Sequence, residues 1–287
     1  MSLIFRRLIF YFLLFIFIIL APIIVAYTAG YRFSPTQRQI VKTGALSITT
    51  LPAGAEITLN GRSGLAYTPT LITNLLPGAY EIKITKAGYH PWMKNLTVED
   101  GKTTFAHNVS LFKLADPEST PTVNDLTSDQ AVPESLGNFK VWYDDNFRKI
   151  VVTNNLLKQR VAELDADQAR WRRQPTPLLF AYSGHEVWQY NPENQSTALI
   201  TRLTEDIHSV IPLPREEAIL IIIASESSGA EKYTIRASEL DSRDHQNSWD
   251  LGKFDAIKKA VLAEDGKTLE VSGIYRGKAG RWQLQLK

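Results

Sequence analysis

Side chains that could do chemistry are few in this sequence, and they stand apart from one another. Structural zinc sites take cysteine and histidine ligands at short fixed spacings, but the 287 residues contain no cysteine. The histidines are all isolated, and they are His90, His107, His185, His208 and His245. Motifs of phosphate-binding loops, serine hydrolases and zinc proteases do not occur. We therefore predict a protein that is not an enzyme and that has no catalytic residues, no metal and no cofactor.

Two polar clusters are weaker candidates for binding. Acidic residues flank Arg243 in the run Asp241–Asp244, but calcium takes about 6–8 oxygen ligands from a defined loop. A solvated turn between strands also explains this run. The basic and aromatic run Arg170–Arg173 could contact an anionic polymer or lipid headgroups. The formal net charge of +2 is close to balance, and it predicts no nucleic-acid partner.

The elements that would position any site begin with a long apolar segment. Residues 8–29 carry no charged side chain, and about 20 apolar residues are enough for a helix to cross a bilayer. The apolar part of a secretory signal peptide is only about 7–15 residues long, and a buried soluble helix is seldom as apolar as this. Residues 1–33 are therefore predicted to be an N-terminal tail and an uncleaved signal-anchor helix that crosses the membrane once.

The orientation of this helix rests on its flanks. Short arginine-bearing tails tend to stay in the cytoplasm, whereas long domains cross largely regardless of their charge. Arg6 and Arg7 precede the helix, so the N-terminus is predicted to be cytoplasmic and the rest of the chain extracytoplasmic, although basic residues also follow the helix. Tyr27, Tyr31 and Phe33 near the outer end suit an aromatic belt at the membrane interface.

Short alternating strands broken by turn residues follow the helix, from residue 44 to about 114. Asn60-Gly61 between two alternating runs is a strong hairpin signal, because a type I′ turn needs positive φ at both central residues. Tyr80 begins the clearest alternating strand, Tyr80–Thr85. The other residues with structural roles at turns and strand ends are Pro52, Gly54, Ala55, Pro69, Pro77, Gly78 and Gly88.

The order of these motifs resembles the PEGA domain, a small β-sandwich of bacterial membrane-anchored proteins. The motifs are Leu-x-Ile, Pro-x-Gly-Ala, Asn-Gly, Thr-Pro, Leu-Pro-Gly-x-Tyr and Lys-x-Gly-Tyr. Ala53 stands where the name-giving turn has glutamate. The resemblance implies a surface-exposed display or binding module at 44–114, with no catalytic residues. Tyr89 and Trp92 are candidate binding aromatics for a sugar or a peptide, and the alternative is that they close the end of the sandwich core.

The chain beyond a polar linker at 115–138 is again rich in predicted strands. An apolar strand, a polar turn and a strand with an aromatic residue recur from 177, 218 and 268, roughly 40–50 residues apart, as in propeller blades. A weaker copy covers 140–162. Residues 139–287 are therefore predicted to resemble a β-propeller of about three to four blades, and a second β-sandwich is the alternative. Residues 165–173 are predicted to form a short helix.

These elements together predict an all-β fold behind one transmembrane helix. We expect a membrane-anchored, non-catalytic binding protein of the cell envelope, whose partner is a protein or a cell-wall polymer. Two other functions stay open at this point. One is an envelope enzyme or sensor with its site on the propeller-like face, and the other is a structural subunit of an envelope complex.

Overall fold

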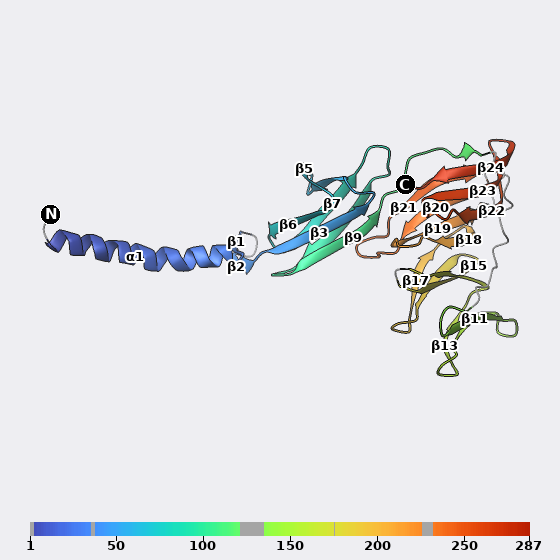
Figure 1. Ribbon diagram of the computed structural model, residues 1–287, viewed down its shortest axis with the longest axis horizontal. Coiled ribbons are helices and arrows are strands. Elements are labelled where there is room, and N and C mark those ends of the chain that lie inside the picture. Colours follow the sequence, from blue (N-terminus) through green and yellow to red (C-terminus); the bar gives the residue numbers. More distant parts are fainter. Residues whose placement is uncertain (1–2, 36–37, 121–134, 175, 226–231) are drawn as a thin grey trace.

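The computed structural model describes residues 3–35, 38–120, 135–174, 176–225 and 232–287. The chain is mostly β, as predicted, with one helix followed by 24 strands in the described residues. Figure 1 shows three parts in chain order: the helix, a sandwich of two sheets, and a row of further sheets.

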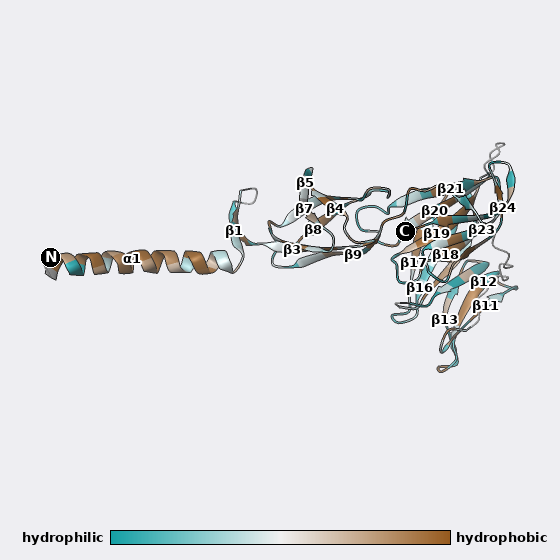
Figure 2. Cartoon of the chain, turned by 45° about the horizontal axis from the view of Figure 1, so that its top comes forward, coloured by the Kyte–Doolittle hydropathy of each residue, from teal (hydrophilic) through white to brown (hydrophobic). Residues whose placement is uncertain are grey.

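The helix α1 (Leu3–Thr28) has 26 residues and is therefore about 39 Å long. Within the described residues it is the one helix that is long and apolar enough to cross a membrane. None of its apolar window is buried against the rest of the protein, and it projects away from the strands as a largely hydrophobic rod (Figure 2). The helix is thus compatible with the predicted single-pass anchor.

A small hairpin follows the helix. Strands β1 (Tyr31–Ser34) and β2 (Gln39–Lys42) pair in antiparallel fashion, with Phe33 opposite Ile40. Thr43, just after the hairpin, holds it to the helix end, since its backbone N–H and its hydroxyl both donate hydrogen bonds to the carbonyl oxygen of Gly30.

The β3–β9 sandwich comes next, in two sheets with strand orders β6-β3-β9 and β5-β4-β7-β8. Alternate residues of β3 and β7 point inward, among them Leu46 and Ile82, which are fully buried. Asn60 and Gly61 both have positive φ, 47° and 75°, so the predicted tight hairpin is confirmed. The strands are β3 (Gly44–Leu51), β4 (Glu56–Leu59), β5 (Arg62–Tyr67), β6 (Thr70–Leu75), β7 (Gly78–Thr85), β8 (Trp92–Val98) and β9 (Thr103–Ser110).

Within the described residues the C-terminal region contains four antiparallel sheets, whose strands are consecutive in the chain except for one strand of the fourth sheet. The first sheet contains β11 (Phe139–Asp144), β12 (Lys149–Asn154) and β13 (Gln159–Leu164). The second contains β14 (Gln168–Arg172), β15 (Leu178–Ser183), β16 (Glu186–Asn191) and β17 (Ser196–Arg202). The third contains β18 (Asp206–Pro212), β19 (Ala218–Ala224), β20 (Tyr233–Glu239) and β21 (Ser248–Phe254). The fourth contains β22 (Ala256–Leu262), β23 (Thr268–Tyr275) and β24 (Lys278–Gln285), with β10 (Glu118–Ser119) added beside β24.

Each predicted repeat therefore corresponds to a sheet, but a closed propeller is not confirmed. Apolar clusters join the first sheet to the second, the second to the third and the third to the fourth. Within the described residues none of these clusters joins the fourth sheet back to the first. Figure 1 shows the two at opposite ends of the row. Strand β10 lies in the predicted linker, most of which falls outside the described residues.

The predicted helix at 165–173 is wrong. Gln168–Arg172 form the strand β14, which pairs along its length with the buried strand β15. Ala169 is fully buried, and Arg172 is 2% exposed. Pairing with an apolar neighbouring strand decides the conformation here, because intrinsic helix preference is weak and tertiary context overrides it.

Candidate functional site

The β3–β9 sandwich and the third and fourth C-terminal sheets share one hydrophobic core. Phe112, which follows β9, is fully buried and packs against Trp249 of β21, with ring centroids 5.3 Å apart and the rings tilted by 42°. The indole N–H of Trp249 donates a hydrogen bond to the carbonyl oxygen of Pro91. We call this contact region the joint, defined by β8 on one side and by Glu239–Trp249 on the other.

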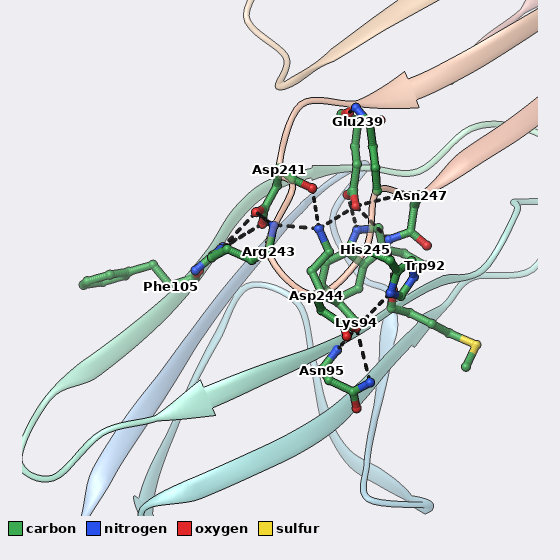
Figure 3. A network of polar contacts seen from close by, with 12 residues as sticks. Trp92, Lys94, Asn95, Phe105, Glu239, Asp241, Arg243, Asp244, His245 and Asn247 are labelled. Carbon is green, nitrogen blue, oxygen red and sulfur yellow. Dashed lines mark hydrogen bonds and ion pairs between the residues drawn. The ribbon is translucent and has the colours of Figure 1, made fainter. Parts of the chain in front are cut away.

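A buried lysine lies at the centre of the joint. The alternation of β8 turns Trp92, Lys94, Leu96 and Val98 inward together, and the side chain of Lys94 is 0% exposed. Its Nζ lies 2.6 Å from Oε1 of Glu239, and it donates a 2.7 Å hydrogen bond to the backbone oxygen of Asp241 (Figure 3). A buried charge without a partner costs several kcal/mol, so these contacts are what allow Lys94 to be buried.

Glu239, the last residue of β20, accepts hydrogen bonds from several donors around Lys94. Its Oε2 accepts a 2.7 Å hydrogen bond from the indole N–H of Trp92. Its Oε1 accepts hydrogen bonds from the backbone and the side-chain amide of Asn247, at 2.9 and 2.8 Å. The side-chain amide of Asn247 also donates to the carbonyl oxygen of Met93. Both carboxylate oxygens therefore accept hydrogen bonds, as is usual for a buried carboxylate.

The rim of the joint is held by two further carboxylates. Burial would raise the pKa of Asp241, but hydrogen bonds from the side chain and backbone of Arg243 and the charge of Lys94 outweigh it and lower the pKa. The backbone N–H of Asn95 donates a 2.8 Å hydrogen bond to Asp244, and this contact is the main reason that the pKa of Asp244 is lowered. The ionised forms of both carboxylates therefore stabilise the joint.

A comparison with known protein families bears on one side of this joint. Residues 43–111 match the family described as the PEGA domain. Residues 43–111 form a PEGA domain. The match coincides with the β3–β9 sandwich, but it covers less than half of the chain and leaves the four C-terminal sheets unassigned. A search of curated proteins found no match.

A cavity of about 680 Å³ lies between the PEGA domain and the C-terminal sheets. Its walls are the turn after β3 at 51–52, the loops at 174, 214–216 and 264–267, and Lys287. These loops belong to the second, third and fourth sheets and lead in each from the first strand to the next. The cavity is therefore bordered by four separate units of the fold.

The inner wall of this cavity contains an ion pair. Nζ of Lys287 lies 2.9 Å from Oε2 of Glu216, and both side chains are less than a tenth exposed. The hydroxyl of Ser110 donates a 2.6 Å hydrogen bond to the same oxygen. Burial lowers the pKa of Lys287, although the charge of Glu216 opposes this shift. The cavity thus combines apolar wall residues, such as Leu51 and Pro214, with charged groups.

Of the two aromatic residues predicted to bind ligands, Trp92 lies in the joint and Tyr89 lies in the segment before β8. Trp92 is 1% exposed and donates to Glu239, so its ring offers no free surface. Tyr89 is half-buried and packs against the shared core. Both positions therefore resemble the alternative that the sequence left open, in which these residues close the end of the sandwich.

The structural residues of the PEGA motif lie at turns and strand ends. Ala55 is fully buried in the core, and the hydroxyl of Tyr80 donates a hydrogen bond to the backbone of Leu76. Several of these residues have positive φ or follow a cis peptide bond, and they are Pro52, Gly54, Asn60, Gly61, Pro69, Gly78 and Gly88. Pro77 lies in the turn between β6 and β7.

The two polar clusters singled out in the sequence lie in different parts of the fold, and both bind other groups of the protein. Arg172 turns inward and donates a 2.6 Å hydrogen bond to the carbonyl oxygen of Glu216. The run Asp241–Asp244 forms the rim of the joint, where its carboxylates bind protein donors. Among the residues that the structure describes, no three His, Cys, Asp or Glu side chains are placed to hold a metal ion.

Sequence reasoning singled out Trp92 and the run Asp241–Asp244 for other reasons, and it missed the central residues of the joint, which are Lys94, Glu239 and Asn247. One signal was present: Lys94 stands at an inward position of β8, between Trp92 and Leu96. A charged residue at an inward position indicates a buried partner. The sequence does not show that the partner is Glu239.

Proposed function

We propose that this protein is a single-pass, membrane-anchored, non-catalytic binding protein. It presents the PEGA domain and the C-terminal sheets as one rigid unit outside the cytoplasm, to a protein or a cell-wall polymer. The observation that carries this proposal is the joint. A shared core and the buried Lys94–Glu239 pair connect the anchored domain directly to the C-terminal sheets.

The joint would link the position of the C-terminal sheets to that of the membrane helix. The helix ends at Thr28, and only a short hairpin separates it from the PEGA domain. A rigid joint then fixes how far the C-terminal sheets stand from the membrane and which way they face. A flexible linker would leave both undefined. Fixed presentation suits a protein that must meet a partner at a set distance from the membrane.

The cavity between the PEGA domain and the sheets is the proposed contact point for the partner. Binding sites are commonly concave, largely apolar and provided with a few polar groups, and this cavity has both kinds of wall. A partner that enters it would touch loops of three sheets and the PEGA domain together.

The side of the membrane on which the β domains lie tests the proposal. Because the chain has no cysteine, single cysteines can be placed at Leu71 in the PEGA domain, at Leu156 in the first C-terminal sheet and at Ile4 in the first turn of α1, all exposed. A membrane-impermeant maleimide added to spheroplasts should label L71C and L156C without lysis. The I4C variant should be labelled only after permeabilisation. The opposite pattern would place the β domains in the cytoplasm and overturn the proposal.

Photo-crosslinking in cells tests the cavity. A photoreactive amino acid at Lys267, on the cavity wall, should give specific adducts of higher mass. The same group at Leu156, far along the row of sheets, is the matched control. Equal adducts at both positions, or adducts at Leu156 alone, would contradict a contact point in the cavity.

A further inference from the structure

We infer that the β1–β2 hairpin lies in the headgroup region of the bilayer, with Tyr31, Phe33 and Ile40 turned into lipid. The hairpin would then act as a collar that sets how the PEGA domain stands on the membrane. This inference rests on the proposed membrane span, and it adds a second contact with the same membrane.

The length of the helix places the hairpin at the right depth. Arg7 is the last charge before the apolar run, and Tyr27 is twenty positions later, which corresponds to about 30 Å of helix. The hydrocarbon core of a bilayer is also about 30 Å thick, within about 40–45 Å including the headgroups. Tyr27 therefore falls at the far boundary of the hydrocarbon, and the hairpin, which begins at Tyr31, falls among the headgroups.

The two faces of the hairpin differ sharply. Residues directly opposite or two apart on paired strands share a face, so Phe33, Ile40 and Tyr31 lie together. These three side chains are 62%, 70% and 44% exposed. On the other face Val41 is 5% exposed and Ser34 is 4% exposed. Val41 and Ser34 are thus packed against protein, whereas the other face presents three large apolar side chains together with the exposed Lys42, which lies opposite Tyr31.

The hairpin is fixed to the helix end in an orientation that suits a surface. Figure 2 shows it standing across the axis of α1, which is along the plane of a bilayer that the helix crosses. The guanidinium of Arg32 lies 3.5 Å from the centroid of the Tyr27 ring. It donates hydrogen bonds to the carbonyl oxygen of Tyr27 at 2.6 Å and to Oδ1 of Asn74 in the PEGA domain at 3.4 Å. Arg32 therefore links helix, hairpin and domain.

Lipid is the occupant that the composition favours. Tyrosine at the membrane boundary and arginine with its charge among headgroups are the usual anchors at this depth. The hairpin has only two strands of four residues each. A stable protein interface takes about 800 Å² from each partner, or about 20–30 residues, so this face alone is too small for one. Its position directly after the helix means that any bilayer around α1 also meets the hairpin.

Electron paramagnetic resonance on the full chain tests the inference. Single nitroxide labels are placed at Phe33, at Ile40, at Phe15 inside the helix and at Leu71 in the PEGA domain, in vesicles of phosphatidylcholine and phosphatidylglycerol. We expect the accessibility to oxygen relative to a water-soluble nickel chelate to be several-fold higher at F33C and I40C than at L71C. It should be highest at F15C.

The other outcomes separate the hairpin from the span. If F15C is protected from nickel but F33C and I40C are as accessible to nickel as L71C, the span holds and the lipid contact is wrong. If F15C is also accessible to nickel, the span itself fails, and the proposed function fails with it. Strong spin–spin broadening at F33C would show that a second copy covers this face, and it would also overturn the inference.

Discussion

The joint between the PEGA domain and the third sheet differs from the junction between the first and second sheets. Both have an apolar core. At the joint the ion pair of Lys94 and Glu239 is buried, whereas at the other junction the carboxylate of Asp165, which pairs with Lys149, is 82% exposed. Apolar contacts are non-directional, whereas a buried pair accepts few geometries. The buried pair therefore fixes the relative orientation of the two parts at the joint. At the other junction the apolar contacts hold the two sheets together without fixing their orientation in this way.

The two regions also differ in how they relate to the sequence. The first sheet packs against its neighbour in the chain. The PEGA domain instead packs against a strand far along the chain, and Trp92 and Glu239 are 147 positions apart. The last strand of the fourth sheet pairs with β10, which precedes the first sheet. The contacts of the PEGA domain and of the fourth sheet thus bring together segments that are distant in the chain.

Removing the buried lysine should have the largest effect. The K94M variant leaves the carboxylate of Glu239 buried without its cation, and breaking such a pair costs about 3–5 kcal/mol. Chemical denaturation of the full chain in detergent measures the free energy of unfolding. The matched control is K149M, which removes an exposed pair and should cost at most about 1 kcal/mol. Equal losses in the two variants would remove the distinction between the two regions.

A truncated side chain in the apolar core of the first sheet should lower the free energy of unfolding by a comparable or smaller amount. Its effect should be local to the first sheet. Leu164 is 4% exposed in the cluster that joins the first two sheets, and L164A should cost about 2–5 kcal/mol. Hydrogen exchange should speed up in β11–β13 and remain slow in β8. Faster exchange in β8 would show that the joint depends on the far end of the row.

Loss of one hydrogen bond at the joint should be milder. The W92F variant keeps most of the aromatic surface but leaves Oε2 of Glu239 without its indole donor. An unsatisfied buried acceptor costs about 1–3 kcal/mol. In a double-mutant cycle W92F and E239Q should be strongly non-additive, because they share this contact. Simple additivity would contradict the assigned role of the indole.

Acid should weaken the joint to a lesser degree. The folded pKa values of Asp241 and Asp244 are lowered, so both stabilise the fold above the ordinary pKa of aspartate, about 3.9. This contribution is lost as the pH falls from that value through the lowered values. Hydrogen exchange of β8 should therefore accelerate on acidification, and less so in a D241N/D244N variant. An identical acid response in that variant would exclude these carboxylates as its cause.

The smallest effect is expected at an exposed turn of the first sheet. Leu156 is 73% exposed, and surface substitutions away from special features usually change stability by at most about 0.5 kcal/mol. The L156S variant should therefore unfold like the unmodified chain. A larger loss would indicate that this turn is covered by a partner or by a second copy.

Local patterns in the sequence predicted most of the fold. The apolar run predicts α1, and the alternation and turn residues predict the PEGA domain and the sheet repeats. The helix predicted at 165–173 was wrong because the pairing of β14 with β15 overrides local preference. The Lys94–Glu239 pair was not predictable as a pair, because a period of two shows only which face of β8 is inward. Whether the row of sheets closes also depends on contacts between distant segments.

Rigidity across the joint is the central claim, and one distance measurement tests it most directly. Nitroxides are attached to the double variant L71C/A279C, which labels an exposed position in the PEGA domain and one on β24. Pulsed dipolar spectroscopy on the full chain should give a single narrow distance distribution, and adding K94M should broaden it. A broad distribution in the chain with Lys94 intact would show that the two parts move independently and would contradict the account.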